Sequence, residues 1–411
     1  MICRAEHSAA TIIAICLAIV ASPTRSDQLS DWVKALKSPS VAARADAVEA
    51  LAKEAQSPGG KARCRPAYGP LMAALSDPVE SVRKQAMRAL ASLDSRSDVP
   101  ALIGLLSSQN AYNREAGATL LGILGDRRAS DALVKAVGDR DPAVRGAATE
   151  ALGALGDPRA SASLLPLLSD SSARVRLKTV TALGALRDRG TATAILPLLH
   201  DSDPGVQRNA AVALAKIGNP GVAPELMKII EGASTGNRFD VRFYAAFALG
   251  ALGDHRAVPV LIHGLTDKDR DVRVAAAIGL GQLKDPKATA GLIAGMKDPS
   301  DLMRWTCAQS LGNLRDRRAV PVLIKGLKDS NEDVREQSAK ALGKIGDKSA
   351  VPGLIAVFSD SDEAIPKAAV LALGRIRDKS ALPFVKKLLN HPDASVRLAA
   401  AEVAKTLESS P

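Results

Sequence analysis

Residues 138–157 read GDRDPAVRGAATEALGALGD, and residues 266–281 repeat the pattern as TDKDRDVRVAAAIGLG. Both stretches contain an Asp-rich turn, then an arginine, then small and aliphatic residues at intervals of three or four. Such intervals are typical of one face of an α-helix. Similar stretches this far apart in one chain indicate internal repetition, which decides the fold before any other feature does.

The arginine of these stretches marks a regular period. Aligned arginines stand at positions 44, 83, 114, 145, 176, 242, 273, 304, 335 and 397, with Gln207 and Pro366 in the two gaps. Neighbouring marks lie 31 residues apart, except for one spacing of 39 and one of 35. The sequence therefore predicts twelve repeats of one unit rather than two or three separate globular domains.

Each repeat predicts a pair of helices. The first helix carries an apolar run with an early proline, such as Pro259, where the missing N–H would have no intrahelical partner. The second helix begins after an N-cap such as Asp141 and ends at a glycine suited to a left-handed C-cap. A pair this short cannot bury its own apolar face, so the pairs are expected to stack into an α-solenoid.

Two insertions interrupt the period. Residues 56–69 add eight residues and residues 231–240 add four. The glycine and proline content of the first insertion indicates an exposed loop. Both are expected to be loops within a single solenoid over residues 27–411, because added loop length costs little free energy.

The repeat resembles the HEAT-repeat family, in particular the short, 31-residue repeats of phycobilisome-lyase-like proteins, over residues from about 28 to 408. The resemblance implies an all-α fold, a right-handed superhelix of about twelve helix pairs whose second helices line the concave surface. It also implies a hydrogen-bonded ladder between neighbouring repeats, built from the arginine and from an Asp six residues before it. The expected ladder residues are Arg83, Arg114, Arg145, Arg176, Arg242, Arg273, Arg304, Arg335 and Arg397, with Asp77, Asp139, Asp170, Asp267, Asp298 and Asp329. Gln207 is expected to weaken one rung, and Pro366 to remove one.

The composition limits the core and leaves the partner open. Hydrophobic residues make up 46% of the chain but aromatic residues only 2%, so Ala, Leu, Val and Ile must build the core. The formal net charge is +11 and the isoelectric point about 9.5. A basic balance is compatible with nucleic acid, an anionic membrane surface or an acidic protein. It is equally compatible with an ordinary solvated surface, because the sequence has no run of five or six basic residues.

The N-terminus has the pattern of a secretory signal. Arg4 precedes an apolar stretch at residues 9–21, and polar residues follow it. The stretch is too short for a transmembrane helix, which needs about 20 residues. We therefore expect residues 1–26 to be a signal peptide, with an uncleaved anchor as the alternative, and the protein to be exported to the periplasm or the extracellular space. No membrane span is expected once the signal is removed.

The sequence contains no catalytic constellation that we could identify. It lacks the His-Glu-x-x-His, Gly-x-Ser-x-Gly, phosphate-loop and dinucleotide motifs, and none of its five histidines is followed by Glu. Removal of the signal leaves only Cys64 and Cys307, about eight repeats apart, for which neither a disulfide nor a metal site is expected. We expect no enzyme activity, metal or cofactor. A lyase-like or oxidoreductase-like enzyme or maturation factor, as the resemblance to phycobilisome lyases and deoxyhypusine hydroxylase allows, is an alternative.

Function in a solenoid is expected where the second helices vary. Counted from the arginine, offsets +3, +6, +7 and +10 carry small or aliphatic residues and predict the core, whereas +1, +5 and +9, with +2 beside them, predict the exposed side. In repeats seven to nine this side becomes apolar and aromatic, between basic positions in the flanking repeats. The candidate binding residues are Phe243, Tyr244, Phe247, Val274, Ile278 and Trp305, with Arg208, Lys216, Lys340 and Lys344 on the rim.

This pattern favours a non-catalytic interaction scaffold outside the cytoplasm. An aromatic strip with a basic rim is typical of an interface with a protein partner, here an apolar segment with acidic flanks. The competing interpretation is that the rings pack on their neighbours and serve stability only. A basic solenoid that binds nucleic acid is a further alternative, against which both the apolar strip and the export signal argue. The oligomeric state is left open.

Overall fold

The structure is a computed structural model that describes residues 25–93, 96–232 and 241–409. The predicted signal and most of the insertion at residues 231–240 lie outside these residues. The chain divides into two compact units, Met1–Leu186 (unit 1) and Arg187–Pro411 (unit 2). The described residues form helices joined by short turns and include no strand, which confirms the prediction of an all-α repeat fold.

Unit 1 contains five complete repeats. Its α-helices are α2 (Arg25–Ala35), α3 (Val41–Gln56), α4 (Gly60–Cys64), α5 (Tyr68–Ala74), α6 (Glu80–Leu93), α7 (Val99–Leu105), α8 (Ala111–Leu124), α9 (Ser130–Ala136), α10 (Pro142–Leu155), α11 (Ser161–Leu164) and α12 (Ala173–Leu186). Short 3-10 turns extend several of them: η1 (Arg65–Ala67), η2 (Arg96–Asp98), η3 (Arg127–Ala129), η4 (Pro158–Ala160) and η5 (Leu165–Ser169).

Unit 2 contains seven repeats. Its α-helices are α13 (Ala192–Ile195), α14 (Pro204–Ile217), α15 (Ala223–Glu231), α16 (Val241–Leu252), α17 (Val258–Gly264), α18 (Arg270–Leu283), α19 (Thr289–Gly295), α20 (Asp301–Leu314), α21 (Val320–Gly326), α22 (Glu332–Ile345), α23 (Val351–Ile355), α24 (Ala364–Ile376), α25 (Leu382–Lys387) and α26 (Ala394–Glu408). Its 3-10 turns are η6 (Arg189–Thr191), η7 (Leu196–His200), η8 (Pro220–Val222), η9 (His255–Ala257), η10 (Pro286–Ala288), η11 (Arg317–Ala319), η12 (Lys348–Ala350), η13 (Lys379–Ala381) and η14 (Leu388–Asn390).

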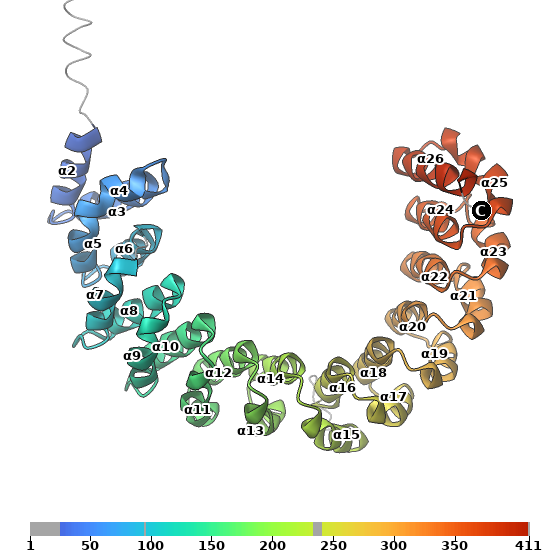
Figure 1. Ribbon diagram of the computed structural model, residues 1–411, viewed down its shortest axis with the longest axis horizontal. Helices are drawn as coiled ribbons and strands as arrows, with labels where there is room; N and C mark the ends of the chain where they lie inside the picture. The colour runs from blue at the N-terminus through green and yellow to red at the C-terminus, as the bar shows by residue number, and fades with distance from the viewer. Residues whose placement is uncertain (1–24, 94–95, 233–240, 410–411) are drawn as a thin grey trace, which may run out of the picture. The chain divides into compact units, whose positions relative to one another are not determined.

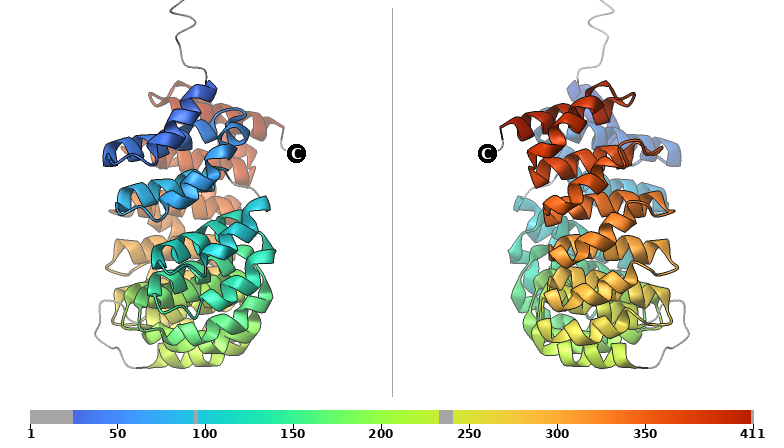
Figure 2. Two further views of the ribbon diagram at one scale, coloured as in Figure 1. Left: turned by 90° about the vertical axis from the view of Figure 1, so that its left-hand side faces the viewer. Right: turned by 90° about the vertical axis from the view of Figure 1, so that its right-hand side faces the viewer.

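Within each unit the long second helices form one layer and the short first helices form another (Figure 1). In unit 2 the second helices α14 to α26 follow one another along the inner side of the stack, with α13, α15 and the other first helices outside (Figure 1). The side views show successive helices of a unit lying roughly parallel, one above the next (Figure 2). Because each second helix contacts the next, a single continuous face runs along the stack of each unit.

Local sequence signals set the helix ends. Asp141 accepts a hydrogen bond from the backbone N–H of Ala143 at 2.8 Å, as predicted for an N-cap. Gly156 and Gly346 end their helices at φ 62° and 75°, in the left-handed region that glycine adopts without a steric penalty. Lys284 and Arg315 take the same conformation at φ 54° and 55°. The C-cap geometry therefore belongs to the repeat and is kept even where the glycine is lost.

Small residues bring neighbouring second helices close together. A Cβ added to Gly153 of α10 would lie 2.9 Å from the Cα of Ala182 on α12. The equivalent Gly312 of α20 meets Ala341 of α22 at the same distance. The leucine just before each glycine, such as Leu311, is fully buried. Replacing a buried leucine of this kind with alanine typically costs about 2–5 kcal/mol. Such contacts build the core from aliphatic and small side chains, as the composition requires.

The insertion at residues 56–69 differs from the exposed loop that we predicted. Its residues form α4 and η1, and Gly60, Cys64 and Ala67 are buried. Gly60 makes this possible, because a Cβ there would collide with the backbone carbonyl of Glu54 at the end of α3. Arg63 then binds the Glu54 carboxylate, with Nε 2.7 Å from Oε1. The glycines of this segment allow close packing, a role that the sequence pattern does not distinguish from a loop.

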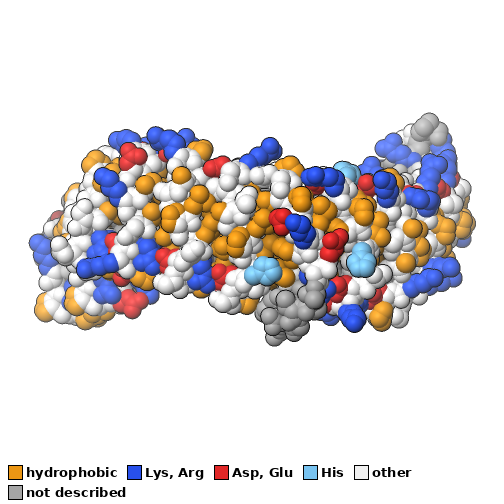
Figure 3. Space-filling model, turned by 90° about the horizontal axis from the view of Figure 1, so that it is seen from below, with side chains coloured by type: hydrophobic (Ala, Val, Ile, Leu, Met, Phe, Trp, Pro, Cys, Tyr) orange, Lys and Arg blue, Asp and Glu red, His pale blue; other side chains and the backbone are white. Residues whose placement is uncertain are grey.

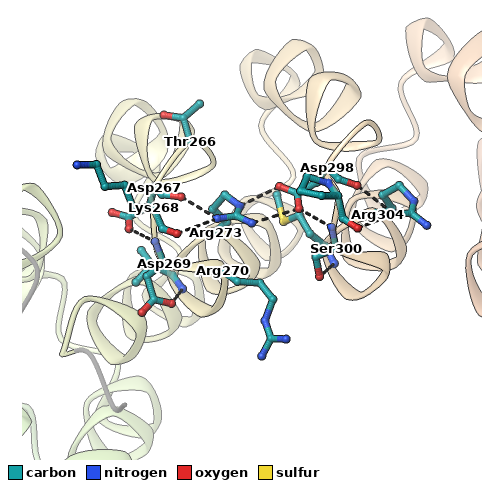
Figure 4. Close-up of polar contacts among 12 residues, drawn as sticks. Thr266, Asp267, Lys268, Asp269, Arg270, Arg273, Asp298, Ser300 and Arg304 are labelled. Atoms are coloured by element: carbon teal, nitrogen blue, oxygen red, sulfur yellow. Dashed lines mark hydrogen bonds and ion pairs between the residues drawn. The ribbon is translucent and has the colours of Figure 1, made fainter. Parts of the chain in front are cut away.

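Arginine–aspartate rungs connect consecutive repeats. Arg304 donates from Nε and Nη2 to the two carboxylate oxygens of Asp329 in the next repeat, both at 2.8 Å. Its Nη1 donates to the backbone carbonyl of Asp298 in its own turn, at 3.0 Å. Figure 4 shows the preceding rung, where Arg273 reaches Asp298 with Nε 2.8 Å from Oδ2. Each such arginine thus bonds to the turn of its own repeat and to the aspartate in the turn of the next repeat.

The described ladder extends the predicted one. The rungs are Arg44–Asp77, Arg114–Asp139 and Arg145–Asp170 in unit 1, and Arg242–Asp267, Arg273–Asp298, Arg304–Asp329 and Arg335–Asp360 in unit 2. Asp360 was not among the predicted residues, because its own repeat carries Pro366 in place of the arginine. Both partners are largely buried; the Arg145 and Asp170 side chains are 15% and 6% exposed. A buried bidentate pair of this kind fixes geometry as well as charge.

Two predicted ladder arginines, Arg83 and Arg397, bond differently. Arg83 donates to the carbonyl of Asp77 at 2.8 Å and its guanidinium lies over the ring of Tyr112, 4.7 Å from the centroid. In the next repeat, Ser108 occupies the position where a carboxylate would complete the rung. Arg397 donates to the carbonyls of His391 and Pro392 in its own turn. Arg176 donates to the carbonyl of Asp170 at 2.9 Å, the same contact to its own turn that the rung-forming arginines make.

Replacing Arg145 with methionine should destabilise unit 1 strongly. The change leaves the Asp170 carboxylate buried without its cation, which typically costs about 3 kcal/mol or more. Urea unfolding followed by circular dichroism measures the effect. Adding Asp170→Asn should recover part of the loss, because the uncompensated charge is then removed. Arg174→Met on the neighbouring second helix α12, where the side chain is exposed, is the matched control. Equal effects of Arg145→Met and Arg174→Met would refute a structural role for the rung.

Stability should fall steeply in acid. The hydrogen bond from Arg114 holds the pKa of Asp139 below its ordinary value of 3.8, and that from Arg145 does the same for Asp170. A carboxylate with a lowered folded-state pKa stabilises the protein above the unfolded-state pKa, and this contribution is lost as the pH falls through the folded-state pKa. The melting temperature should therefore be level near pH 6 and decline below about pH 4. The double variant Arg114→Met/Asp139→Asn should decline less, and identical pH curves for the two proteins would contradict the assignment.

Candidate partner-binding surface

The exposed side of the second helices in unit 2 is the surface on which partner binding was predicted. We call it the inner face and define it by offsets −2, +1, +5 and +9 from the ladder position. Side chains at these offsets are exposed or partly exposed in most repeats, whereas those at +2 are buried in α16, α18, α20, α22 and α24. The prediction had placed +2 on the exposed side. It is buried because successive second helices pack directly against each other.

Only some residues of the predicted aromatic strip are accessible to a partner. Phe243, Phe247, Ile278 and Trp305 are partly exposed on the inner face, as predicted. Tyr244 is only 6% exposed and Val274 only 7%, so neither offers a surface to a partner. Tyr244 lies at the buried offset +2. Val274 is a short side chain between helices that carry Phe243 and Trp305 at the same offset.

The interpretation that the rings pack on one another holds for one pair. The rings of Phe243 and Tyr244 meet edge to face, with centroids 5.2 Å apart. Burial raises the pKa of the Tyr244 hydroxyl. Tyr244 is therefore a buried residue against which Phe243 packs. The apolar side chains that are accessible to a partner lie mainly on α16, α18 and α20.

A hollow of about 390 Å³ opens beside Trp305 at the start of α20 and α22. Leu302, 44% exposed, lines it together with Trp305, and Asp301, Asn331 and Asp333 complete the lining. Leu302 was missed because offset −2 lies in the first turn, where most other repeats carry a small or polar residue. The large apolar residue at a position that is usually small or polar was the feature of the sequence that could have identified Leu302.

The predicted basic rim has two different ends. Arg208 and Lys216 on α14 are exposed. Lys340 and Lys344 on α22 are partly buried and line a larger cavity of about 510 Å³ against α24. Lys340 pairs with Glu336 at 2.8 Å, and Lys344 donates to the Asn313 side-chain oxygen at 2.9 Å. Burial lowers the pKa of Lys344, and the charges of Arg375, Arg315 and Lys340 lower it further.

The first-helix side of unit 2 has a different character. In a space-filling view onto α13, α15 and α17, hydrophobic side chains are interspersed with single charged side chains and histidines (Figure 3). The hollow there, about 450 Å³, is lined by Leu196, His200, Glu225 and Lys228 among others. Lys228 pairs with Glu225 at 2.9 Å, so the two charges compensate each other.

The residues with potential for chemistry are scattered over the described part of the chain. No group of three or more His, Cys, Asp or Glu side chains there could hold a metal ion. Cys64 and Cys307 are free thiols, both buried, and burial raises the pKa of each. His255 contacts the Asp285 carboxylate at 3.1 Å in an exposed position. None of these groups combines a nucleophile with a base. No helix among the described residues has the length and apolarity needed to cross a bilayer.

Solved structures with similar architecture include importin-type solenoids. A crystal structure of importin beta superposes with a TM-score of 0.70 at 15% identity, over 98% of this chain and 65% of that one. Yeast importin-beta (Kap95p) gives 0.66 at 12% identity, over 99% and 65%. The karyopherin Kap121p, bound to the extreme C-terminus of the protein phosphatase Cdc14p, gives 0.59 at 16%, over 95% and 51%. At these identities the likeness concerns the fold alone, and this chain spans at most 65% of each of these proteins.

Comparison with protein families identifies the repeat. A search of curated proteins found no match. The family model for HEAT repeats matches in overlapping segments at residues 29–118, 99–176, 161–237, 227–302, 289–365 and 351–410. This match does not distinguish the phycobilisome-lyase-like subtype from other HEAT repeats. Because the segments cover nearly the whole chain, this protein belongs to the HEAT-repeat family.

Proposed function

We propose that this protein is a non-catalytic scaffold that binds a protein partner on the inner face of unit 2, centred on α16, α18 and α20. The observation that carries the proposal is that Leu302, which is exposed, and Trp305, which is partly exposed, line the same hollow of about 390 Å³. A partner that covers exposed large apolar side chains removes their surface from water, which favours binding. Aromatic side chains that fill pockets contribute most of the binding free energy at many interfaces. Phe247 and Ile278 extend the apolar surface along the neighbouring second helices.

The partner segment would be apolar with acidic flanks. Its apolar part would lie over Phe247, Ile278 and Trp305, and its acidic flanks would meet Arg208 and Lys216 at one end and Lys344 at the other. The Kap121p structure named above supports this mode by analogy, since there a karyopherin holds the end of another protein. The analogy concerns the scaffold and not the identity of the partner.

Replacing Leu302 and Trp305 together with serine should abolish partner capture. The lost apolar contacts typically account for several kcal/mol at an interface hot spot. Tagged wild-type and variant chains, recovered from their native cells and compared by mass spectrometry, measure the effect. Because Leu302 is exposed and Trp305 is partly exposed, the melting temperature should change by no more than about 3 °C.

The matched control is Phe384→Ser. Phe384 is an exposed aromatic residue on α25, on the first-helix side, where Lys387 lies 5.6 Å from its ring centroid. Its replacement should leave partner capture unchanged. Undiminished capture by the Leu302/Trp305 variant, or equal losses for both proteins, would rule out the inner face as the binding surface.

We also propose that the protein is exported. The support is the composition of residues 1–26, with Arg4 ahead of an apolar stretch that is short for a membrane span. Cell fractionation with mass spectrometry of the intact chain tests it: the mature protein should lack the first 21 or more residues and be found outside the cytoplasm. Deleting residues 2–26 should retain it inside. A full-length chain in the cytoplasmic fraction would contradict export, and a full-length chain in the membrane fraction would indicate the anchor.

A further inference from the structure

A cavity near the C-terminal end of unit 2 lies between second helices. It measures about 510 Å³ and is formed mainly by α22 and α24, with Ser395 of α26 at its edge. This size is in the range of cavities that bind small molecules or a few residues of a peptide. Its lining combines the basic side chains Lys340, Lys344, Lys367 and Arg375 with the apolar Leu371.

Positive charge in this cavity is only partly compensated. Lys340 has a carboxylate partner, Glu336. Within the described residues, Lys344, Lys367 and Arg375 form no ion pair, and the hydrogen bond of Lys344 goes to a neutral amide oxygen. Burial lowers the pKa of Lys344, and the charge of the neighbouring Arg375 lowers it further, because both disfavour its ammonium form. An anionic group placed among these side chains would relieve that repulsion.

The remaining lining residues narrow the class of anion. Glu336 and Glu363 also line the cavity, so a chain of evenly spaced phosphates would meet like charges there. Leu371 is 36% exposed, and Ala364 and Ala368 lie beside it. The side-chain amides of Gln309 and Gln337 can bond to a peptide backbone. A surface with separated cations, amides and apolar patches suits a polypeptide with carboxylates between aliphatic residues.

We propose that this cavity is a docking site for an acidic segment of a protein, with Lys344, Lys367 and Arg375 binding its carboxylates and Leu371 contacting its aliphatic side chains. This inference rests on the proposed scaffold function, since it identifies what the inner face binds beyond the apolar strip. The cavity shares no lining residue with the hollow at Leu302 and Trp305, so replacing those two side chains leaves the cavity unchanged.

The test uses the full chain and a fluorescent peptide of about ten residues that alternates Glu with Leu and Ala. Anisotropy titration at low salt should show saturable binding that weakens as salt is added, because screening reduces each charge contact. Lys344→Gln/Arg375→Gln should weaken the peptide at least tenfold, while Lys344→Arg should bind within about threefold of the wild-type chain. The control Lys328→Gln/Lys348→Gln removes two exposed lysines outside the cavity lining, one in the turn after α21 and one in η12, and should bind like wild type.

Competing ligands decide the chemical class. A peptide with Lys in place of Glu should not bind, and inorganic phosphate or a short single-stranded DNA should compete only weakly. Failure of the peptide to bind, equal weakening by the two double variants at unchanged melting temperature, or tighter binding of the DNA would each overturn the proposal. The Leu302→Ser/Trp305→Ser variant should still bind the peptide. If that variant loses partner capture but still binds the peptide, the loss is due to the apolar strip and not to this cavity.

Discussion

The contact of each helix pair with the next is the constraint on which the whole structure depends. The second helices are mostly 12 to 16 residues long, and the first helices are shorter. Isolated helices of this length are marginal in water. Stability must therefore come from the interface between neighbouring repeats. There leucines are fully buried, and glycines allow the backbones of adjacent second helices to approach closely. The Arg–Asp rungs complete the same interface at its polar end, because they satisfy turn carbonyls and carboxylates that would otherwise be buried without partners.

This division of roles leaves one side of each second helix unconstrained. The core offsets are occupied by small or aliphatic residues in nearly every repeat, whereas the inner face changes along unit 2 from basic on α14, to apolar on α16 to α20, to charged on α22 and α24. A surface that supports no packing can vary without loss of the fold. The exposure of Leu302 and Trp305 and the uncompensated charges near Lys344 are features that the stack itself does not require. Recognition of a partner is the physical account that we propose for both.

The sequence predicted the repeat number, the helix pairs, the caps and most ladder residues, because each follows from a period of 31 and from local hydrogen-bonding chemistry. It did not predict the burial of Tyr244 and Val274. Helical periodicity predicts on which side of its own helix a side chain lies. Whether that side is buried depends on how closely the neighbouring second helix packs against it. The helix α4 was missed for a related reason, since Gly60 allows a close approach to α3 that only the tertiary structure reveals. The signal and the 231–240 insertion lie largely outside the described residues and stay predictions.

The most direct measurement of the central claim is a double-mutant cycle at the junction of α24 and α26, which lacks a rung. Pro366 stands there in the arginine position, and His391 stands in the aspartate position, where its Nδ1 already accepts the backbone N–H of Asp393 at 3.1 Å. Pro366→Arg and His391→Asp alone should each lower the free energy of unfolding, because each places one charge without its partner at a position that is not fully exposed. Together they should stabilise unit 2 by about 1–3 kcal/mol more than the sum of the single changes, because a new rung forms. A coupling energy of zero would show that the rungs accompany the stacking of the repeats without contributing to it.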